Sequence, residues 1–297
     1  MPLRVIVAAA FVAAVLAPAA GASQLIDRDA KGVRLEVNDQ GFALLTYRAR
    51  GRVRHVLARG AVNALPSTAV RPRVAFRLDY SGGWGMFRRD AWKTFRNSCT
   101  PARPPLRWLV AACRARDGSL WAVQSWRRAL PNYGLRPTDW LEGAWELRLS
   151  HWTGAMPQLT VRFGWAYRRY QQLYGRLTYL GRPVHGFHST PAGQPVDSFG
   201  RNVYVDTFDS AYGAGWRREN SFLTHGVTGG FCYGFYPHGV RPMGRGRRYR
   251  ATVIGPGVTP DVYWEGTPPP IYQRDFDLIA NEDMSRLLAG DPHCRPS

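Results

Sequence analysis

Four histidines lie in the sequence between residues 185 and 238, with Asp206 and Asp209 among them. The histidines are His185, His188, His225 and His238. Imidazole and carboxylate groups together can bind a metal ion or transfer a proton. His185 and His188 are three residues apart in a loop-like segment, and this spacing fixes no coordination geometry. We therefore assign the four histidines and Asp206 to a predicted ligand-binding surface, and histidines that only hydrogen-bond the backbone are the simpler alternative. The pattern identifies no catalytic residue, and we expect no metal ion.

The segment from 202 to 225 combines aromatic and charged side chains at high density. Its aromatic residues are Tyr204, Phe208, Tyr212, Trp216 and Phe222. This mixture is typical of the rim of a ligand-binding site, although a hydrogen-bonded loop packed on a sheet has the same composition. We add Tyr204, Trp216 and Arg217 to the candidate ligand-binding residues, and Trp216 with Arg217 is the first pair to mutate.

Two further groups of charged residues are open to two interpretations. The run RPMGRGRRYR from Arg241 to Arg250 holds five arginines and is either a solvated entry to a strand or a site for an anionic ligand. Glu142 and Glu146 lie four residues apart, which is about 13 Å along a strand. A glycosidase pair needs roughly 5 to 9.5 Å, so a partner such as Asp261 or Glu265 would be required. The simpler interpretation is a solvent-facing carboxylate beside Arg148.

Tryptophan is concentrated in the middle of the chain, where seven of the 11 lie between Trp108 and Trp165. Trp145 and Trp165 fall on apolar strand faces and are predicted to pack in the core. Trp126 and Trp152 fall on polar faces, where an indole can stack on a sugar ring or be buried between two sheets. We favour burial for this second pair.

The elements that position these residues are mainly strands, because the dominant period of apolar residues is two. Strands are predicted over 33–37, 42–47, 53–57, 74–80, 107–116, 119–126, 145–152, 159–165, 173–180, 203–207, 230–236, 249–254 and 262–264. The Asp117-Gly118 pair predicts a tight hairpin turn. Helix is predicted only at 281–290, with Asn281 as its cap. The pattern predicts an all-β fold, β-sandwich or jelly-roll-like, as one large unit or two abutting sandwiches, with a short C-terminal helix.

The N-terminal 22 residues have the layout of a cleavable signal peptide. Arg4 precedes a short apolar run, and the small residues that end at Ala22 match a cleavage site. We expect a secreted all-β chain from residue 23 to 297, without a transmembrane segment, because the apolar run is too short to span a bilayer. If this chain has two domains, their border is expected between 166 and 200, where proline and glycine are frequent.

Four cysteines in an exported chain predict disulfides. The spacing favours Cys99–Cys113 and Cys232–Cys294. The absence of a C-x-x-C pair argues against a zinc site. The sequence gives no reason to expect a cofactor.

The net charge is +19, and 40 residues are Lys or Arg, of which only Lys31 and Lys93 are lysine, leaving 38 arginines. A GC-rich genome explains such usage, and arginine forks that hold carboxylates are the functional alternative. In either case the protein will bind polyanions in a salt-dependent manner. After export, acidic polysaccharides and cell-wall polymers are nearer partners than nucleic acid, which is not expected physiologically.

We therefore expect a secreted β-sandwich protein that binds an acidic or cell-wall-associated glycan without converting it. The alternatives are an exported carbohydrate-active enzyme, either hydrolase or lyase, and a structural or inhibitor-like envelope protein. The sequence lacks the G-x-S-x-G, H-E-x-x-H and S-x-x-K motifs, and this favours the two non-catalytic hypotheses.

Overall fold

The protein is mostly β in the residues that the computed structural model describes. These residues are 23–60, 76–127, 144–166, 170–183, 203–210, 213–220, 230–235, 247–255, 257–268 and 272–288. Within them, 17 strands form four antiparallel sheets, which we call sheets I to IV. The predicted β-sandwich architecture is confirmed.

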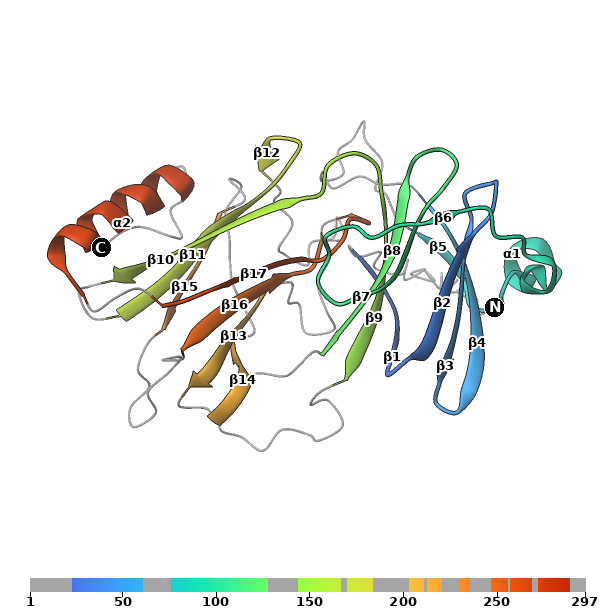
Figure 1. Cartoon of the computed structure of the whole chain (residues 1–297), viewed down its shortest axis with the longest axis horizontal. Helices are drawn as coiled ribbons and strands as arrows, with labels where there is room; N and C mark the ends of the chain where they lie inside the picture. Colours follow the sequence, from blue (N-terminus) through green and yellow to red (C-terminus); the bar gives the residue numbers. More distant parts are fainter. Residues whose placement is uncertain are drawn as a thin grey trace, which may run out of the picture.

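The first sandwich pairs sheets I and II (Figure 1). Sheet I has the order β2 (Lys31–Val37), β3 (Ala43–Ala49), β4 (Arg52–Arg59) and β5 (Arg77–Asp79). Sheet II has the order β1 (Gln24–Arg28), β9 (Trp145–Trp152), β8 (Leu120–Arg127), β7 (Leu109–Arg114) and β6 (Thr100–Pro101). The core between them is built from alternate residues of each strand, such as Leu45 of β3 and Leu149 of β9.

The second sandwich pairs sheets III and IV and carries the C-terminal helix. Sheet III has the order β14 (Gly213–Asn220), β13 (Val203–Ser210), β16 (Arg248–Val253) and β17 (Val262–Gly266). Sheet IV contains β10 (Gln158–Ala166), β11 (Tyr170–Tyr179) and β12 (Arg182–Pro183), and β15 (Gly230–Phe235) also pairs with β11. Helix α2 (Arg274–Leu288) packs on the outside of sheet IV through Met284 and Leu288.

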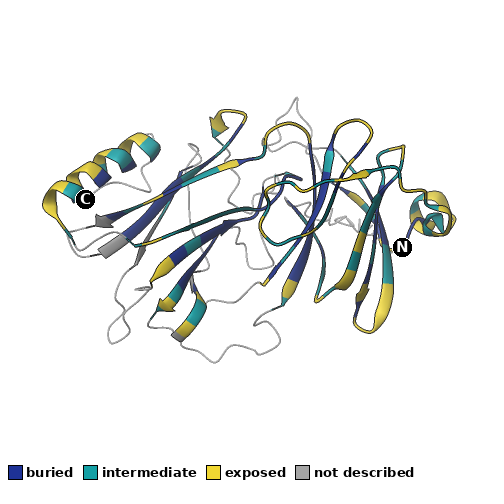
Figure 2. Cartoon of the chain, viewed as in Figure 1, coloured by how far each residue is buried: buried dark blue, intermediate teal, exposed yellow. Residues whose placement is uncertain are grey.

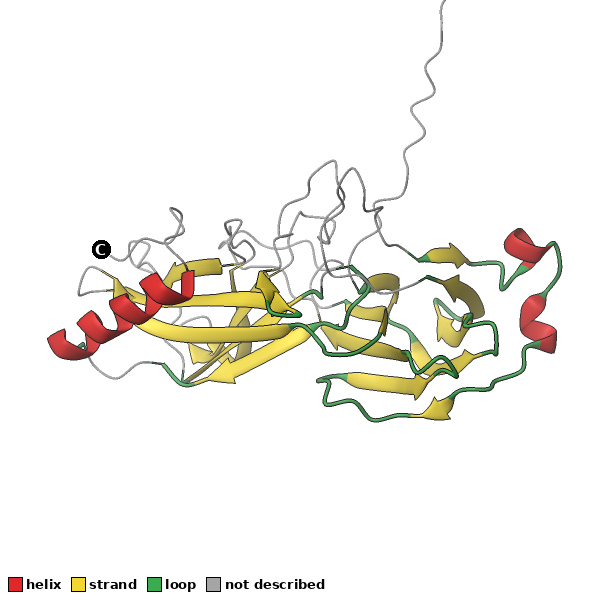
Figure 3. Cartoon of the chain, turned by 90° about the horizontal axis from the view of Figure 1, so that it is seen from above, coloured by secondary structure: helices red, strands yellow, loops and turns green. Residues whose placement is uncertain are grey.

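The layers therefore follow one another in the order α2, IV, III, II, I, because each apolar cluster joins one neighbouring pair. Trp126 of sheet II, Tyr204 of sheet III and Ile254 form the cluster between the two sandwiches. Figure 3 shows the two sandwiches side by side, with the short helices α1 (Trp84–Phe87) and η1 (Ala91–Thr94) at one end and α2 at the other. Strand β9 belongs to sheet II and β10 to sheet IV, so the chain passes from the first sandwich to the second between these strands. That the two sandwiches are separate domains stays a prediction.

Several local predictions are confirmed. The predicted hairpin joins β7 and β8 through Asp117-Gly118, and the backbone N–H of Ser119 donates to an Asp117 carboxylate oxygen at 2.9 Å. Its turn is not the two-residue type I′ turn that this pair favours, because only Gly118 of the two has a positive φ and the Ala115 N–H donates to the Ser119 carbonyl at 2.9 Å. The Cys99–Cys113 disulfide is present. Cys232 is not a free thiol, and its predicted partner Cys294 lies outside the described residues.

Three local predictions are wrong, each because tertiary packing overrides the local pattern. Helix α2 begins at Arg274, so Asn281 lies inside it rather than at its cap, and Met284 is anchored against sheet IV. Glu146 is buried rather than solvent-facing, and its carboxylate accepts hydrogen bonds from Arg148 and Arg28 of the same sheet. Trp145 is 49% exposed, because it is the first residue of β9 and lies opposite Arg127, the last residue of β8. Figure 2 shows buried residues along the strands of both sandwiches and many exposed residues on α2 and on the loops at the ends of the sheets.

The sequence also gave no indication of strand β14. Gly213 and Gly215 lie in this strand, which pairs with β13. Gly215 has a φ of 73°, and the pairing of β13 with β14 shifts register nearby, so this glycine serves an irregular strand.

Candidate functional site

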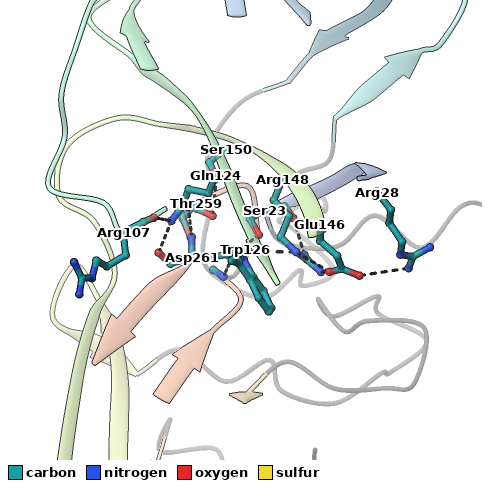
Figure 4. A network of polar contacts seen from close by, with 11 residues as sticks. Ser23, Arg28, Arg107, Gln124, Trp126, Glu146, Arg148, Ser150, Thr259 and Asp261 are labelled. Atoms are coloured by element: carbon teal, nitrogen blue, oxygen red, sulfur yellow. Dashed lines mark hydrogen bonds and ion pairs between the residues drawn. The ribbon is translucent and has the colours of Figure 1, made fainter. Parts of the chain in front are cut away.

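Strands β8 and β9 of sheet II are buried on both faces, and the second face carries charge. Glu146 is 0% exposed, and two nitrogens of Arg148, Nη2 and Nε, donate to its Oε2 at 2.6 and 3.2 Å (Figure 4). Arg28 of β1 donates to the other carboxylate oxygen at 3.4 Å. The Arg148 guanidinium also lies 5.5 Å from the centre of the Trp126 ring. The alternation that gave β9 a polar face therefore produces an internal ion-pair layer.

Asp261, just before β17, links this layer to the second sandwich (Figure 4). Its carboxylate accepts hydrogen bonds from the Ser23 hydroxyl, from Trp126 Nε1 at 2.6 Å and from the Gly255 backbone N–H at 3.0 Å. Its own backbone N–H donates to Gln124 Oε1 at 2.9 Å. One residue thus joins β1, β8 and the β16–β17 connection.

Burial dominates the electrostatics of this network. It raises the pKa of Asp261 above its ordinary value, against the lowering effect of Arg148 and of the three donors. The pKa of Arg148 is also raised: burial, the largest single influence, would lower it, but the charge of Glu146, the charges of Asp261 and Tyr204, and the hydrogen bond to Glu146 together outweigh that effect. Arg148 is therefore a permanent cation, held mainly by Glu146.

The connection between β16 and β17 docks along β9 and fixes the angle between the sandwiches. Val258 is fully buried in the core of the first sandwich, and its carbonyl accepts from the His151 N–H at 2.7 Å. The Ser150 hydroxyl donates to the Thr259 carbonyl at 3.4 Å. At Gly255, a Cβ atom would lie only 2.1 Å from the Pro260 carbonyl oxygen, so this close path needs glycine.

A groove of about 680 Å³ opens beside this junction. Its apolar lining residues are Pro105, Leu106, Met156, Pro157, Leu159 and Val262. Its polar lining residues are Arg107, Arg248, Asp261, Tyr263, Glu265 and Thr267. Both sandwiches contribute to the lining, because residues 105–107 precede β7 of sheet II and residues 262–266 form β17 of sheet III. The groove is our candidate functional site.

Glu265 organises the polar side of the groove. The Tyr263 hydroxyl donates to Glu265 Oε2, and Arg248 Nη1 lies 2.9 Å from Oε1. Arg107 Nη2 is more distant, at 3.9 Å from Oε2, and its guanidinium lies 5.1 Å from the centre of the Tyr263 ring. The side chains of Arg107 and Arg248 are 64% and 47% exposed. Two cations thus share one carboxylate and face solvent.

Burial raises the pKa of Tyr263, and the hydrogen bond to Glu265 raises it further, so the phenol is protonated at neutral pH.

Neighbouring Trp108 has a φ of 54°, a left-handed conformation that is strained for a bulky residue. The Trp108 carbonyl accepts from Ser125 at 2.9 Å, and its ring meets Tyr263 edge-on at 5.0 Å. The first sandwich therefore supports one wall of the groove with a rigid aromatic contact.

The face of sheet III that lies away from sheet IV continues from the groove as a second charged cluster. Asp206 of β13 lies opposite Arg218 of β14 and Arg250 of β16, and each Nε atom is 2.6 Å from a carboxylate oxygen. The Arg250 guanidinium lies 4.4 Å from the centre of the Trp216 ring. Arg248 connects this cluster to Glu265, because its guanidinium also lies 5.4 Å from Trp216.

The structure brings together three of the candidate residues that the sequence suggested. Tyr204, Asp206 and Trp216 share the face of sheet III that continues into the groove, and the Arg218 guanidinium lies 4.4 Å from the Tyr204 ring. Arg217 lies opposite Thr207, on the other face of β14 from Trp216, and is exposed. The four candidate histidines lie outside the described residues. They are His185, His188, His225 and His238.

Other lining residues were only partly visible in the sequence. The arginine run that ends at Arg250 contains Arg248, and Asp261 and Glu265 were considered as carboxylate partners. Tyr263 and Arg107 had no signal, since each is one of many residues of its type. Trp126 and Trp152 are buried, as predicted, at 2% and 1% exposure.

Comparisons with known protein families, sequences and structures add no information about the site. The sequence matches no family model, no curated protein and no solved structure. Within the described residues, no three His, Cys, Asp or Glu side chains form a group that could hold a metal ion. The helices in the same part of the chain are all too short or too polar to cross a membrane.

Proposed function

We propose that the groove between the two sandwiches binds an acidic or cell-wall-associated glycan after export of the protein, and that it does so without chemical conversion. The observation that carries this proposal is the pair of solvent-facing arginines, Arg107 and Arg248, that line one groove from different sandwiches. Arginine forks suit the carboxylate groups of a uronic acid polymer.

The apolar lining supports a sugar ligand as well. Proline, leucine and methionine side chains line the groove beside the two arginines, and the C–H faces of sugar rings can pack on such surfaces. Arg107 is the better contact for a ligand carboxylate, because it lies 3.9 Å from Glu265 whereas Arg248 lies at 2.9 Å. The positive net charge of the chain, +19 for the full sequence, would attract a polyanion to the protein.

Two observations disfavour catalysis at this groove. Elimination on a uronic acid needs a base, but the raised pKa of Tyr263 keeps its hydroxyl protonated. Hydrolysis needs two carboxyl groups with access to the bond, but Asp261 is 2% exposed and accepts hydrogen bonds from three donors.

Affinity electrophoresis tests the proposal in gels cast with polygalacturonate or alginate, with neutral dextran as the control polymer. We expect retardation by the acidic polymers only, weakening as salt rises. Reducing ends and the ultraviolet absorbance of unsaturated products are measured in the same mixtures and are expected to stay at background. Product formation would support the carbohydrate-active enzyme instead, and no retardation would leave the structural envelope module.

A matched pair of variants separates the groove from general attraction. Arg107→Ala is expected to weaken binding roughly tenfold, the equivalent of about 1.4 kcal/mol. Arg52→Ala removes the same charge from an exposed position in β4 of sheet I and is expected to change binding less than about twofold. Equal losses in both variants would show that only net charge matters and would overturn the groove proposal.

A further inference from the structure

Ser23 follows the predicted cleavage site directly, yet it is completely buried in the junction between the sandwiches. It is 0% exposed. Its hydroxyl donates to Asp261, and its carbonyl oxygen accepts from Arg148 Nη1 at 3.0 Å (Figure 4). The first residues of a mature chain are ordinarily exposed and poorly ordered unless something holds them. The burial of this serine therefore needs a physical reason.

Asp261, at the same junction between the sandwiches, lacks a close cationic partner. Arg148 donates to Glu146 at 2.6 and 3.2 Å, whereas its Nε lies 4.0 Å from Asp261. Among the described residues, no other cationic side chain lies within ion-pair distance of Asp261. A buried carboxylate that is hydrogen-bonded but weakly paired is costly, and the raised pKa of Asp261 reflects that cost. A further positive charge at this point would compensate it.

We propose that cleavage after Ala22 places the new α-ammonium group of Ser23 beside Asp261, where the two form a buried ion pair that joins the sandwiches. A signal peptidase hydrolyses the Ala22–Ser23 peptide bond with one water molecule. Ala22 then carries a carboxylate, and Ser23 carries an amine that takes up a proton. The nitrogen and Oγ of one serine are separated by only three bonds, so this ammonium lies within reach of the carboxylate that Oγ contacts.

The ion pair connects maturation of the chain to the groove. Asp261 lines the groove and is bound to Trp126 and Gln124 of β8, so it holds β17 against the first sandwich. Cleavage would therefore complete the junction on which Tyr263 and Glu265 depend. Only this last step rests on the proposed glycan binding, because the ion pair itself needs no ligand.

Two forms of the mature chain test the ion pair. One begins at Ser23, and the other carries one additional glycine before Ser23, which moves the ammonium by about 3.8 Å and leaves an amide at Ser23. We expect the form that begins at Ser23 to melt roughly 4 °C higher or more. The difference is expected to disappear in the Asp261→Asn background. Equal melting temperatures of the two wild-type forms would overturn the proposal.

A second measurement does not depend on the folding of Asp261→Asn. Acylation of the α-amine is compared in native protein and in urea, and we expect at least tenfold slower reaction in the native state. The Ser23→Ala variant keeps the ammonium and should keep most of that protection. An α-amine that reacts as fast in the native protein as in urea would contradict the ion pair.

The chain as secreted by an expression host tests the cleavage step. N-terminal sequencing is expected to start at Ser23, and a start at any other residue would overturn it. Glycan binding is then measured on both forms. A stability difference without glycan binding would keep the ion pair and reject the proposed function, whereas binding without a stability difference would do the reverse.

Discussion

The two faces of strands β8 and β9 are both buried, but they are built from different chemistry. One face presents Val123, Leu147 and Leu149 to the core of the first sandwich. The other presents Glu146 and Arg148 to the second sandwich, where each charge has a partner. The comparison teaches that a polar strand face is not necessarily a solvent face, because a second sheet can cover it.

The two faces are expected to contribute to the fold in different ways. Hydrocarbon burial is non-directional and stabilises in proportion to the area removed from water. A buried ion pair gains little net stability after desolvation, but the loss of one partner is costly. The apolar face should therefore set the stability of the first sandwich, and the charged face should set how the two sandwiches meet.

Removing Arg148 should have the largest effect, because it leaves Glu146 buried without its main cation. Arg148→Met is expected to lower the free energy of unfolding by about 3–5 kcal/mol. Urea unfolding monitored by circular dichroism measures this change. Because the charge holds the junction, we also expect the two sandwiches to unfold less cooperatively with each other in the variant than in the parent protein. Calorimetry should then resolve two transitions in the variant.

The matched control replaces both charges. Arg148→Met combined with Glu146→Gln removes the uncompensated carboxylate and is expected to recover part of the loss. A double variant as unstable as Arg148→Met alone would indicate that lost packing of the long arginine side chain, rather than an unpaired charge, governs this face.

The apolar face is probed by Leu149→Ala. Truncation of this fully buried side chain is expected to cost about 3 kcal/mol, from lost burial and the cavity that remains. In the Arg148→Met background, where two calorimetric transitions are expected, Leu149→Ala should move the transition of the first sandwich while that of the second moves little. A uniform shift of both would show that the two faces of sheet II are not energetically separable.

The contrast also explains how much of the fold the sequence could predict. Strands with alternating residues were predicted correctly, because period two is a local property of the chain. The pattern could not reveal which part of the chain packs against the polar face of a strand. Glu146 was expected to face solvent for this reason, whereas its side of sheet II is buried at the junction, where Trp126 packs with Tyr204 and Ile254. Likewise, helix α2 extends beyond its predicted start because packing on sheet IV, rather than a local cap, supports it.

The candidate site was predictable only to the extent that its residues are unusual in type. Trp216 and Asp206 stood out in an aromatic and charged segment, and they do lie near the groove. Arg107 and Tyr263 come from two different sandwiches, so no spacing in the sequence connects them. Their association depends on the angle at the junction, which is set by buried contacts such as those of Asp261.

A smaller effect is expected from pH, through the apolar face. His151 stacks on Trp121 at 3.8 Å, and burial lowers its pKa below the ordinary value. As the pH falls below about 6.5, His151 is protonated in the unfolded chain before it is protonated in the folded protein. The stability that neutral His151 contributes is therefore lost progressively below this pH. The melting temperature should fall more between pH 7 and pH 5 in the parent than in His151→Gln. Parallel curves would assign the pH dependence to other groups, such as His55, whose pKa burial also lowers.

The smallest effect is expected at the end of the apolar face. Trp145 shares its alternation with Leu147 and Leu149, but it is half exposed at the first position of β9. Trp145→Ser should change the free energy of unfolding by less than about 0.5 kcal/mol, whereas Trp121→Ser, at a fully buried position, should cost about 3–5 kcal/mol. Similar losses in both variants would extend the core to the edge of the sheet. A difference of this size would instead show that alternation predicts only the strand face on which a residue lies. The burial of that residue then depends on the sheet that packs against this face.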